Sequence, residues 1–97
     1  MDFNTALYGF MNMIREDPRL GPSHISLYLA ILYYYKQQNY HSPISIYSRE
    51  LKKQARIAAA GTYHKCMQDL EESGYIQYLP SYNPVLGSLI YLTKIES

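Results

Sequence analysis

Ninety-seven residues, 47% of them hydrophobic, with a net charge of +1, are enough for one folded domain, which we place over residues 1–97. This composition excludes an intrinsically disordered chain, and a single cysteine excludes an internal disulfide framework. The chain does not start with a signal-peptide pattern, and its longest apolar-rich run, Ile25 to Tyr35, is too short to cross a bilayer; we therefore expect a cytoplasmic protein without membrane association.

The first expected helix runs from Asn4 to Glu16, with Asp2 or Asn4 as its cap. Its apolar residues recur at helical spacing and form one stripe: Phe3, Ala6, Leu7, Phe10, Met13 and Ile14. Pro18 ends the helix, because the residue before a proline is driven out of the helical region. We expect the stripe to be buried on its own domain. A second copy of the chain is the alternative, which leaves a homodimer open.

The second expected helix opens at Gly21-Pro22-Ser23 and continues to about Gln38. Five residues at the spacing of one helix face predict that it is the central core helix: Ile25, Tyr28, Leu29, Leu32 and Tyr35. Three more widen the apolar arc and predict packing on two sides: Leu27, Ile31 and Tyr34.

A short strand, Ile44–Ile46, is expected after the loop Asn39–Pro43, and a short helix then runs to about Ala55 with Ser45 or Ser48 as its cap. This helix should turn its apolar residues inward and its basic residues outward. The inward set is Ile46, Leu51 and Ala55, and the outward set is Arg49, Lys52 and Lys53. The turn Ala58–Gly61 that follows has no Ser, Thr or Asp to cap the next helix.

The segment Gly61–Ile76 is expected to form a helix that runs into a strand. Its apolar stripe consists of Tyr63, Cys66, Met67 and Leu70. Gly74 is the expected helix stop, because glycine enters the left-handed conformation without a steric penalty. The strand Tyr75–Leu79, a loop over residues 80–87, and the strand Ser88–Thr93 then predict a hairpin.

Basic residues concentrate before and within this last helix. Five of the nine lie between Arg49 and Lys65, against Glu50 alone: Arg49, Lys52, Lys53, Arg56 and Lys65. The overall charge argues mildly against a nucleic-acid partner, but a local basic patch can still bind phosphates. A solvated helix face is the alternative for any such run. Twelve tyrosines also exceed what a small core needs, and tyrosine is favoured at interfaces.

The expected order α-α-β-α-α-β-β is mainly α with a small β wing (α+β) and resembles a winged helix-turn-helix. Leu70-Glu71-Glu72-Ser73-Gly74-Tyr75-Ile76 is similar to the end of the recognition helix in MarR- and GntR-like regulators. The chain also resembles small winged-helix proteins of bacterial phage and transposon-like elements, notably at residues 17–28 and 62–66. The winged-helix resemblance covers about Ser23 to Thr93, with residues 1–17 as an additional N-terminal helix.

This resemblance implies sequence-specific binding of double-stranded DNA by a transcriptional regulator or an accessory factor of a mobile element. The residues facing the major groove would be Thr62, His64, Lys65 and Gln68. The residues along the flanking phosphates would be Arg49, Lys52, Lys53 and Arg56. The wing tip would present Tyr82 and Asn83, without a cation. The uncharged wing, low net charge and many tyrosines favour an alternative function, a winged-helix module for protein–protein interaction; RNA binding through Tyr82 has no RNA motif behind it.

No pattern in the sequence indicates catalysis or a cofactor. The nitrogen and sulfur candidates for a metal are His24, His41, His64 and Cys66, and their spacing fits no zinc motif. Phosphate-binding loops, dinucleotide fingerprints and nucleophile elbows are also absent from the sequence. We therefore expect no enzyme, no metal, no cofactor and no small-molecule ligand, and we expect Cys66 to be a small core residue.

Overall fold

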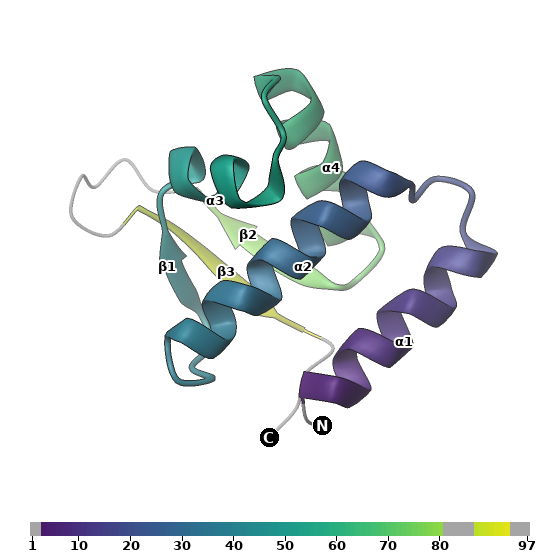
Figure 1. Ribbon diagram of the computed structural model, residues 1–97, viewed down its shortest axis with the longest axis horizontal. Coiled ribbons are helices and arrows are strands. Elements are labelled where there is room, and N and C mark those ends of the chain that lie inside the picture. The colour runs from purple at the N-terminus through teal and green to yellow at the C-terminus, as the bar shows by residue number, and fades with distance from the viewer. Residues whose placement is uncertain (1–2, 81–86, 94–97) are drawn as a thin grey trace.

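The computed structural model describes residues 3–80 and 87–93, which form four helices and a small antiparallel sheet in the expected order (Figure 1). This is a mainly helical α+β architecture. In chain order the elements are α1 (Phe3–Glu16), α2 (Pro22–Gln37), β1 (Ile44–Ile46), α3 (Ser48–Ala55), α4 (Ala60–Glu72), β2 (Ile76–Leu79) and β3 (Ser88–Leu92).

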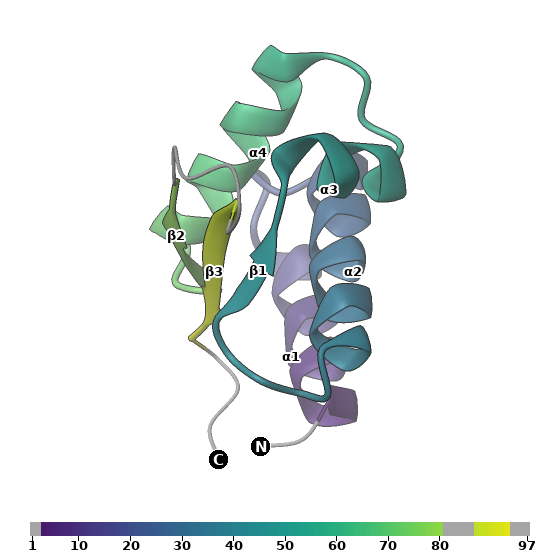
Figure 2. The ribbon, with the colours of Figure 1, turned by 90° about the vertical axis from the view of Figure 1, so that its left-hand side faces the viewer.

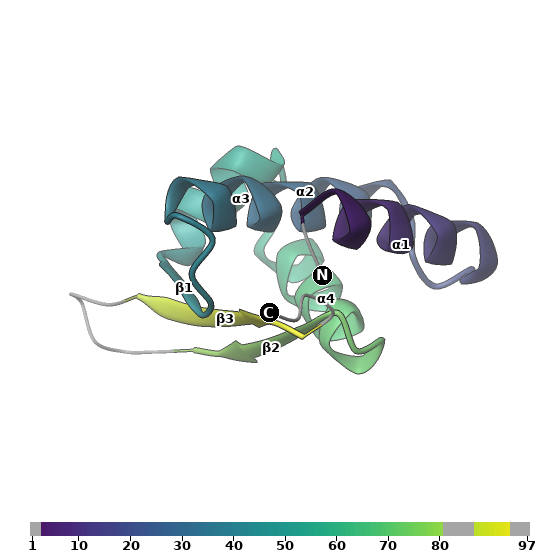
Figure 3. The ribbon, with the colours of Figure 1, turned by 90° about the horizontal axis from the view of Figure 1, so that it is seen from below.

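The three strands are arranged in the order β1-β3-β2, so the last strand of the chain is the central one. The expected hairpin is confirmed: Ile76 pairs with Leu92, and Leu79 pairs with Leu89. On the other side of β3, Ile44 pairs with Ile90. One face of β3 is buried through Ser88, Ile90 and Leu92. Figure 3 shows α1, α2 and α3 in one layer over the sheet, with α4 running from that layer towards the strands.

Helix α2 is the central helix, as expected, and most of its predicted apolar arc is buried, but one predicted core residue is exposed. Leu29 was expected in the core and is 43% exposed, and Ile25 is only partly buried. The fully or nearly fully buried residues are Leu27, Tyr28, Ala30, Ile31, Leu32 and Tyr35. Leu27 and Ile31 are buried, as the predicted wide apolar arc requires, and α2 contacts α1, α3 and α4, whereas Leu29 is left on the outer side.

Helix α1 is packed on the rest of the chain through aromatic rings. Phe10 stacks on Tyr28 of α2 with ring centroids 4.1 Å apart, and meets the ring of Tyr75 edge-on at 5.0 Å. Tyr28 and Tyr75 also meet edge-on at 5.7 Å. All three rings are buried. Met13, expected in the same stripe, is 45% exposed, because it lies at the edge of α1's contact surface.

The junction between α4 and β2 forms where glycine was expected to end the helix. Gly74 has a φ of 83°, its N–H donates to the Glu71 carbonyl, and the N–H of Tyr75 reaches back to the Leu70 carbonyl at 3.0 Å. These two bonds make a Schellman motif, which needs a left-handed residue at position 74. The strand starts one residue later than expected, at Ile76.

The expected serine cap of α3 is wrong. Tyr47 occupies the N-cap position, and Ser48 is already the first residue of the helix. Ser45 belongs to β1, where its backbone N–H and carbonyl are both bound by the side-chain amide of Gln38, at 3.1 and 2.9 Å. Similarly, Asn4 lies within α1 and does not cap it, while Asp2 lies outside the described residues.

We predict that Phe10→Ala lowers the free energy of unfolding by about 3–5 kcal/mol, because it empties the space between two buried rings. The measurement is urea unfolding followed by circular dichroism. Tyr8→Ala on the same helix is the matched control: Tyr8 is 72% exposed, and its loss should change stability by less than about 0.5 kcal/mol. Equal effects of the two substitutions would contradict the packing of α1 described here.

Candidate nucleic-acid interface

Helix α4 separates an apolar from a polar face as expected. Its buried stripe contains Tyr63, Cys66, Met67 and Leu70. The four candidate groove residues are all exposed on the rest of its surface: Thr62, His64, Lys65 and Gln68. Figure 2 shows the N-terminal half of α4 projecting past the end of the sheet.

The polar side chains of α4 are engaged with one another. Lys65 Nζ lies 2.9 Å from Asp69 Oδ1, and Gln68 Nε2 donates to Glu72 Oε1 at 3.1 Å. The His64 ring meets the Tyr63 ring edge-on, with centroids 5.4 Å apart. Any contact between Lys65 or Gln68 and an external group must therefore compete with a bond within the helix.

Three basic residues gather at the C-terminal end of α3. A shallow hollow of about 290 Å³ is lined there by Lys52, Lys53, Arg56, Ile57 and Ala58. Arg49, the fourth candidate, does not line this hollow; it is 82% exposed and 3.7 Å from Glu50. A separate open cleft of about 490 Å³ includes Thr62 and Lys65, so the two groups of candidate residues line different hollows.

Arg56 has an unusual backbone conformation for an arginine. Its φ is 61°, in the left-handed region, where its N–H donates to the Lys53 carbonyl and the next N–H, of Ile57, to that of Lys52. The hydroxyl of Ser26 in α2 donates to the Ala55 carbonyl at the same helix end. A side chain in this region costs about 1 kcal/mol relative to glycine.

Two residues outside the expected site bind α4 to the start of α2. Asp69 is buried, and its Oδ2 lies 2.8 Å from Nε2 of His24. Hydrogen bonds from His24 and then Lys65 hold the pKa of Asp69 below its usual range. From the sequence alone, His24 is a candidate only for metal binding. The sequence does contain one signal of this contact. Asp69 lies three residues after Cys66, which places its carboxylate on the buried side of the helix, where it needs a partner.

The loop between α1 and α2 carries a second ion pair beside this one. Arg19 binds Asp17 through Nε and Nη2, at 3.0 and 2.9 Å, which lowers the pKa of Asp17 to about 2. Arg19 Nη2 also lies 3.2 Å from the hydroxyl of Ser73, at the end of α4. This loop and its arginine therefore fix one wall of the cleft that includes Lys65.

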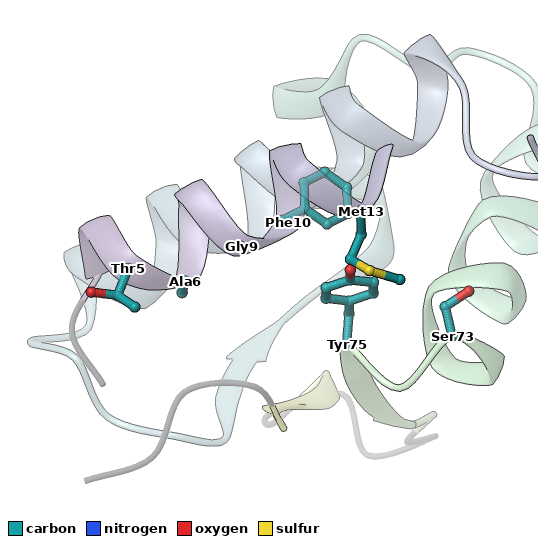
Figure 4. A pocket seen from close by; sticks show the side chains of 7 residues that line it. All are labelled: Thr5, Ala6, Gly9, Phe10, Met13, Ser73 and Tyr75. Atoms are coloured by element: carbon teal, nitrogen blue, oxygen red, sulfur yellow. The ribbon is translucent and has the colours of Figure 1, made fainter. Parts of the chain in front are cut away.

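A second surface of interest is an apolar hollow of about 240 Å³ beside α1. It is lined by Thr5, Ala6, Gly9, Phe10, Met13, Ser73 and Tyr75. In Figure 4, Met13 and Tyr75 lie at one end of this hollow and Thr5 and Ala6 at the other. Small residues on one side of α1 leave the space open.

The remaining expectations concern the wing, the cysteine, metal binding and membrane crossing. The wing residues Tyr82 and Asn83 lie outside the described residues. Cys66 is buried, and burial raises the pKa of its thiol. Within residues 3–80 and 87–93, the acidic, histidine and cysteine side chains form no group suited to holding a metal, and no helix has the length and apolar character to cross a membrane.

Comparisons with protein-family models, with curated proteins and with solved structures found no match.

We predict that Asp69→Asn lowers the free energy of unfolding at pH 7 by about 1–2 kcal/mol, because it removes a buried charge that binds two partners. The pKa of Asp69 is depressed in the folded protein, so its contribution is present above its ordinary value of 3.8 and is lost as the pH falls through the folded value. In urea unfolding, the difference in stability between parent and variant should therefore begin to shrink below about pH 4 and disappear only once the pH is below the folded pKa of Asp69. Glu16→Gln, at an exposed carboxylate of α1, is the control and should match the parent at pH 7.

Proposed function

We propose that this chain is a winged helix-turn-helix protein that binds double-stranded DNA, with α4 in the major groove and α3 beside the phosphates. The observation that carries the proposal is the exposed polar face of α4 immediately after the basic end of α3. A helix fits the major groove, where Gln68 can read adenine and Lys65 guanine. Thr62 and His64 complete the exposed face of α4.

The electrostatics of α3 support this proposal. Among the described residues, Lys52, Lys53 and Arg56 have no carboxylate within ion-pairing distance, whereas Arg19 and Lys65 each have one. Unneutralised cations attract phosphates and release condensed counterions when they bind. The cations of α3 therefore suit affinity, and the side chains of α4 suit sequence selection.

The proposed role is non-catalytic and needs no cofactor. By the resemblance described above, it is that of a cytoplasmic regulator or an accessory factor of a mobile element. Binding is expected to depend strongly on salt concentration. The first experiment is to map backbone amide shifts with a mixed-sequence duplex at low and near-physiological salt, where shifts should centre on residues 49–68 and fade as salt rises.

We predict that the double variant Lys52→Ala/Lys53→Ala weakens binding to all duplexes alike, by roughly tenfold or more at 0.1 M salt, and reduces the log–log salt slope by about 2. In contrast, Lys65→Ala and Gln68→Ala should change the preferred sequence. The measurement is fluorescence anisotropy at several salt concentrations. Lys36→Ala removes one exposed lysine near the end of α2, outside the proposed interface, and is the control that should bind like the parent. If the double variant, Lys65→Ala and Gln68→Ala all bound duplexes as the parent does, the assignment of faces would be overturned.

We also predict opposite effects of Arg56→Gly on stability and on binding. Glycine accepts a φ of 61° without strain, so the free energy of unfolding should rise by about 1 kcal/mol. The affinity for DNA should fall, because a cation is lost. Asn39→Gly is the matched control, since Asn39 has a φ of 59° after α2. It tests the same backbone conformation without removing a charge and should leave affinity unchanged. A loss of both stability and affinity in Arg56→Gly would contradict this reading.

The hollow beside α1 favours a second candidate function, a protein-interaction module. Large hydrophobic side chains on α1 and α2 are also exposed: Tyr8, Met11, Met13, Leu29 and Tyr33. Such a module would bind duplexes weakly and without salt dependence, and would form a stoichiometric complex with a protein partner. Salt-sensitive duplex binding centred on α3 and α4 distinguishes the first function from this one.

A further inference from the structure

The carboxylate of Asp69 bridges a partly buried histidine and an exposed lysine. One oxygen lies 2.8 Å from His24 Nε2, and the other lies 2.9 Å from Lys65 Nζ. The side chain of Lys65 is 71% exposed, whereas those of His24 and Asp69 are 12% and 10% exposed. The carboxylate therefore has one partner inside the protein and one that can be drawn into solvent or onto a ligand.

The other ring nitrogen of His24 identifies the protonation state of this arrangement. His24 Nδ1 lies 3.0 Å from the backbone N–H of Gly21, which can only donate. Nδ1 is therefore the acceptor, and Nε2 carries the proton that it donates to Asp69. The ring is neutral in this arrangement, and the positive partner of the carboxylate is Lys65.

This balance changes when Lys65 binds elsewhere. If the ammonium moves to a phosphate or a base, Asp69 remains as a buried anion with one neutral partner, which is costly. A proton taken from solvent by His24 Nδ1 restores an ion pair, at the expense of the bond from the Gly21 N–H. A nearby opposite charge favours the charged form of an ionisable group, so losing Lys65 makes this protonation easier.

We propose that His24 and Asp69 are positioning residues for Lys65, and that transfer of Lys65 from Asp69 to duplex DNA is coupled to the uptake of one proton by His24. This inference rests on the proposed function and adds to it a dependence of binding on pH. Since linkage is reciprocal, DNA favours the protonated ring and a lower pH favours the complex.

The charged surroundings of His24 come from two parts of the described chain. Helix α4 contributes Asp69, Lys65 and the thiol of Cys66, and the loop before α2 contributes Asp17 and Arg19. Asp17 and Arg19 form an ion pair with each other and so largely cancel. Asp69 and Lys65 are therefore the charges whose rearrangement His24 senses.

The test is binding of a mixed-sequence 20-base-pair duplex between pH 5.5 and 8 at constant ionic strength. The affinity of the parent should fall about fivefold from pH 6.0 to 7.5, within the limit of tenfold per pH unit for one proton. His24→Gln should lose this dependence. His41→Gln is the matched control, because His41 is an exposed histidine in the loop after α2, outside the proposed interface, and it should keep the dependence. Equal pH dependence in parent and His24→Gln would overturn the coupling.

Nitrogen-15 spectra of the imidazole rings provide a readout that needs no variant. At one and the same pH, the fraction of His24 rings with both nitrogens protonated should be larger in the complex than in the free parent protein. A neutral His24 in a complex that forms equally well at every pH overturns the coupling alone. Absence of duplex binding at every pH overturns the proposed function and the coupling with it.

A measurement without DNA separates these two failures. In Lys65→Ala, the His24 ring should take up its second proton at a higher pH than in the parent, because the competing cation is gone. The same titration in parent and variant would show that Lys65 does not control His24, whatever the protein binds.

Discussion

The packing of Phe10, Tyr28 and Tyr75 is the contact on which the arrangement of the helices depends. Aromatic rings bury large areas and add favourable geometry when stacked or edge-on. Tyr75 also ends α4 through its N–H, and its carbonyl accepts the N–H of Thr93, directly after β3. One residue thus joins α1, the end of α4 and the sheet. With its C-terminal end held there, α4 extends its N-terminal half away from the sheet (Figure 2).

The cations of α3 and α4 differ in a way that bears on how a complex would form. Those at the end of α3 are not neutralised by a carboxylate among the described residues. Their electric field therefore attracts a polyanion from a distance and raises the rate of encounter. Lys65 must exchange one partner for another, and Gln68 must release Glu72. In the proposed complex, the first contacts would therefore be general, and the sequence-dependent ones would follow at the cost of internal bonds.

The local elements could be predicted from the sequence because their causes are local. The apolar spacing along α4 and the glycine at position 74 specify a helix and its end without reference to other parts of the chain. The exposed positions of Thr62, His64, Lys65 and Gln68 follow from the same spacing.

Features that depend on distant contacts were missed. Leu29 is exposed because of where α1 and α3 pack on α2, and periodicity within α2 does not contain that information. The Gln38 side chain that binds Ser45 depends on the turn between α2 and β1. His24 and Asp69 are 45 residues apart, so nothing local indicated that they meet.

The single thiol has a practical consequence. Cys66 lies on the inner face of α4, and burial both shields its sulfur and disfavours its reactive thiolate. A thiol reagent can modify it only when the helix detaches, so the rate of labelling measures how often α4 opens. The native chain thus carries its own reporter of the local opening of α4, without the introduction of a probe.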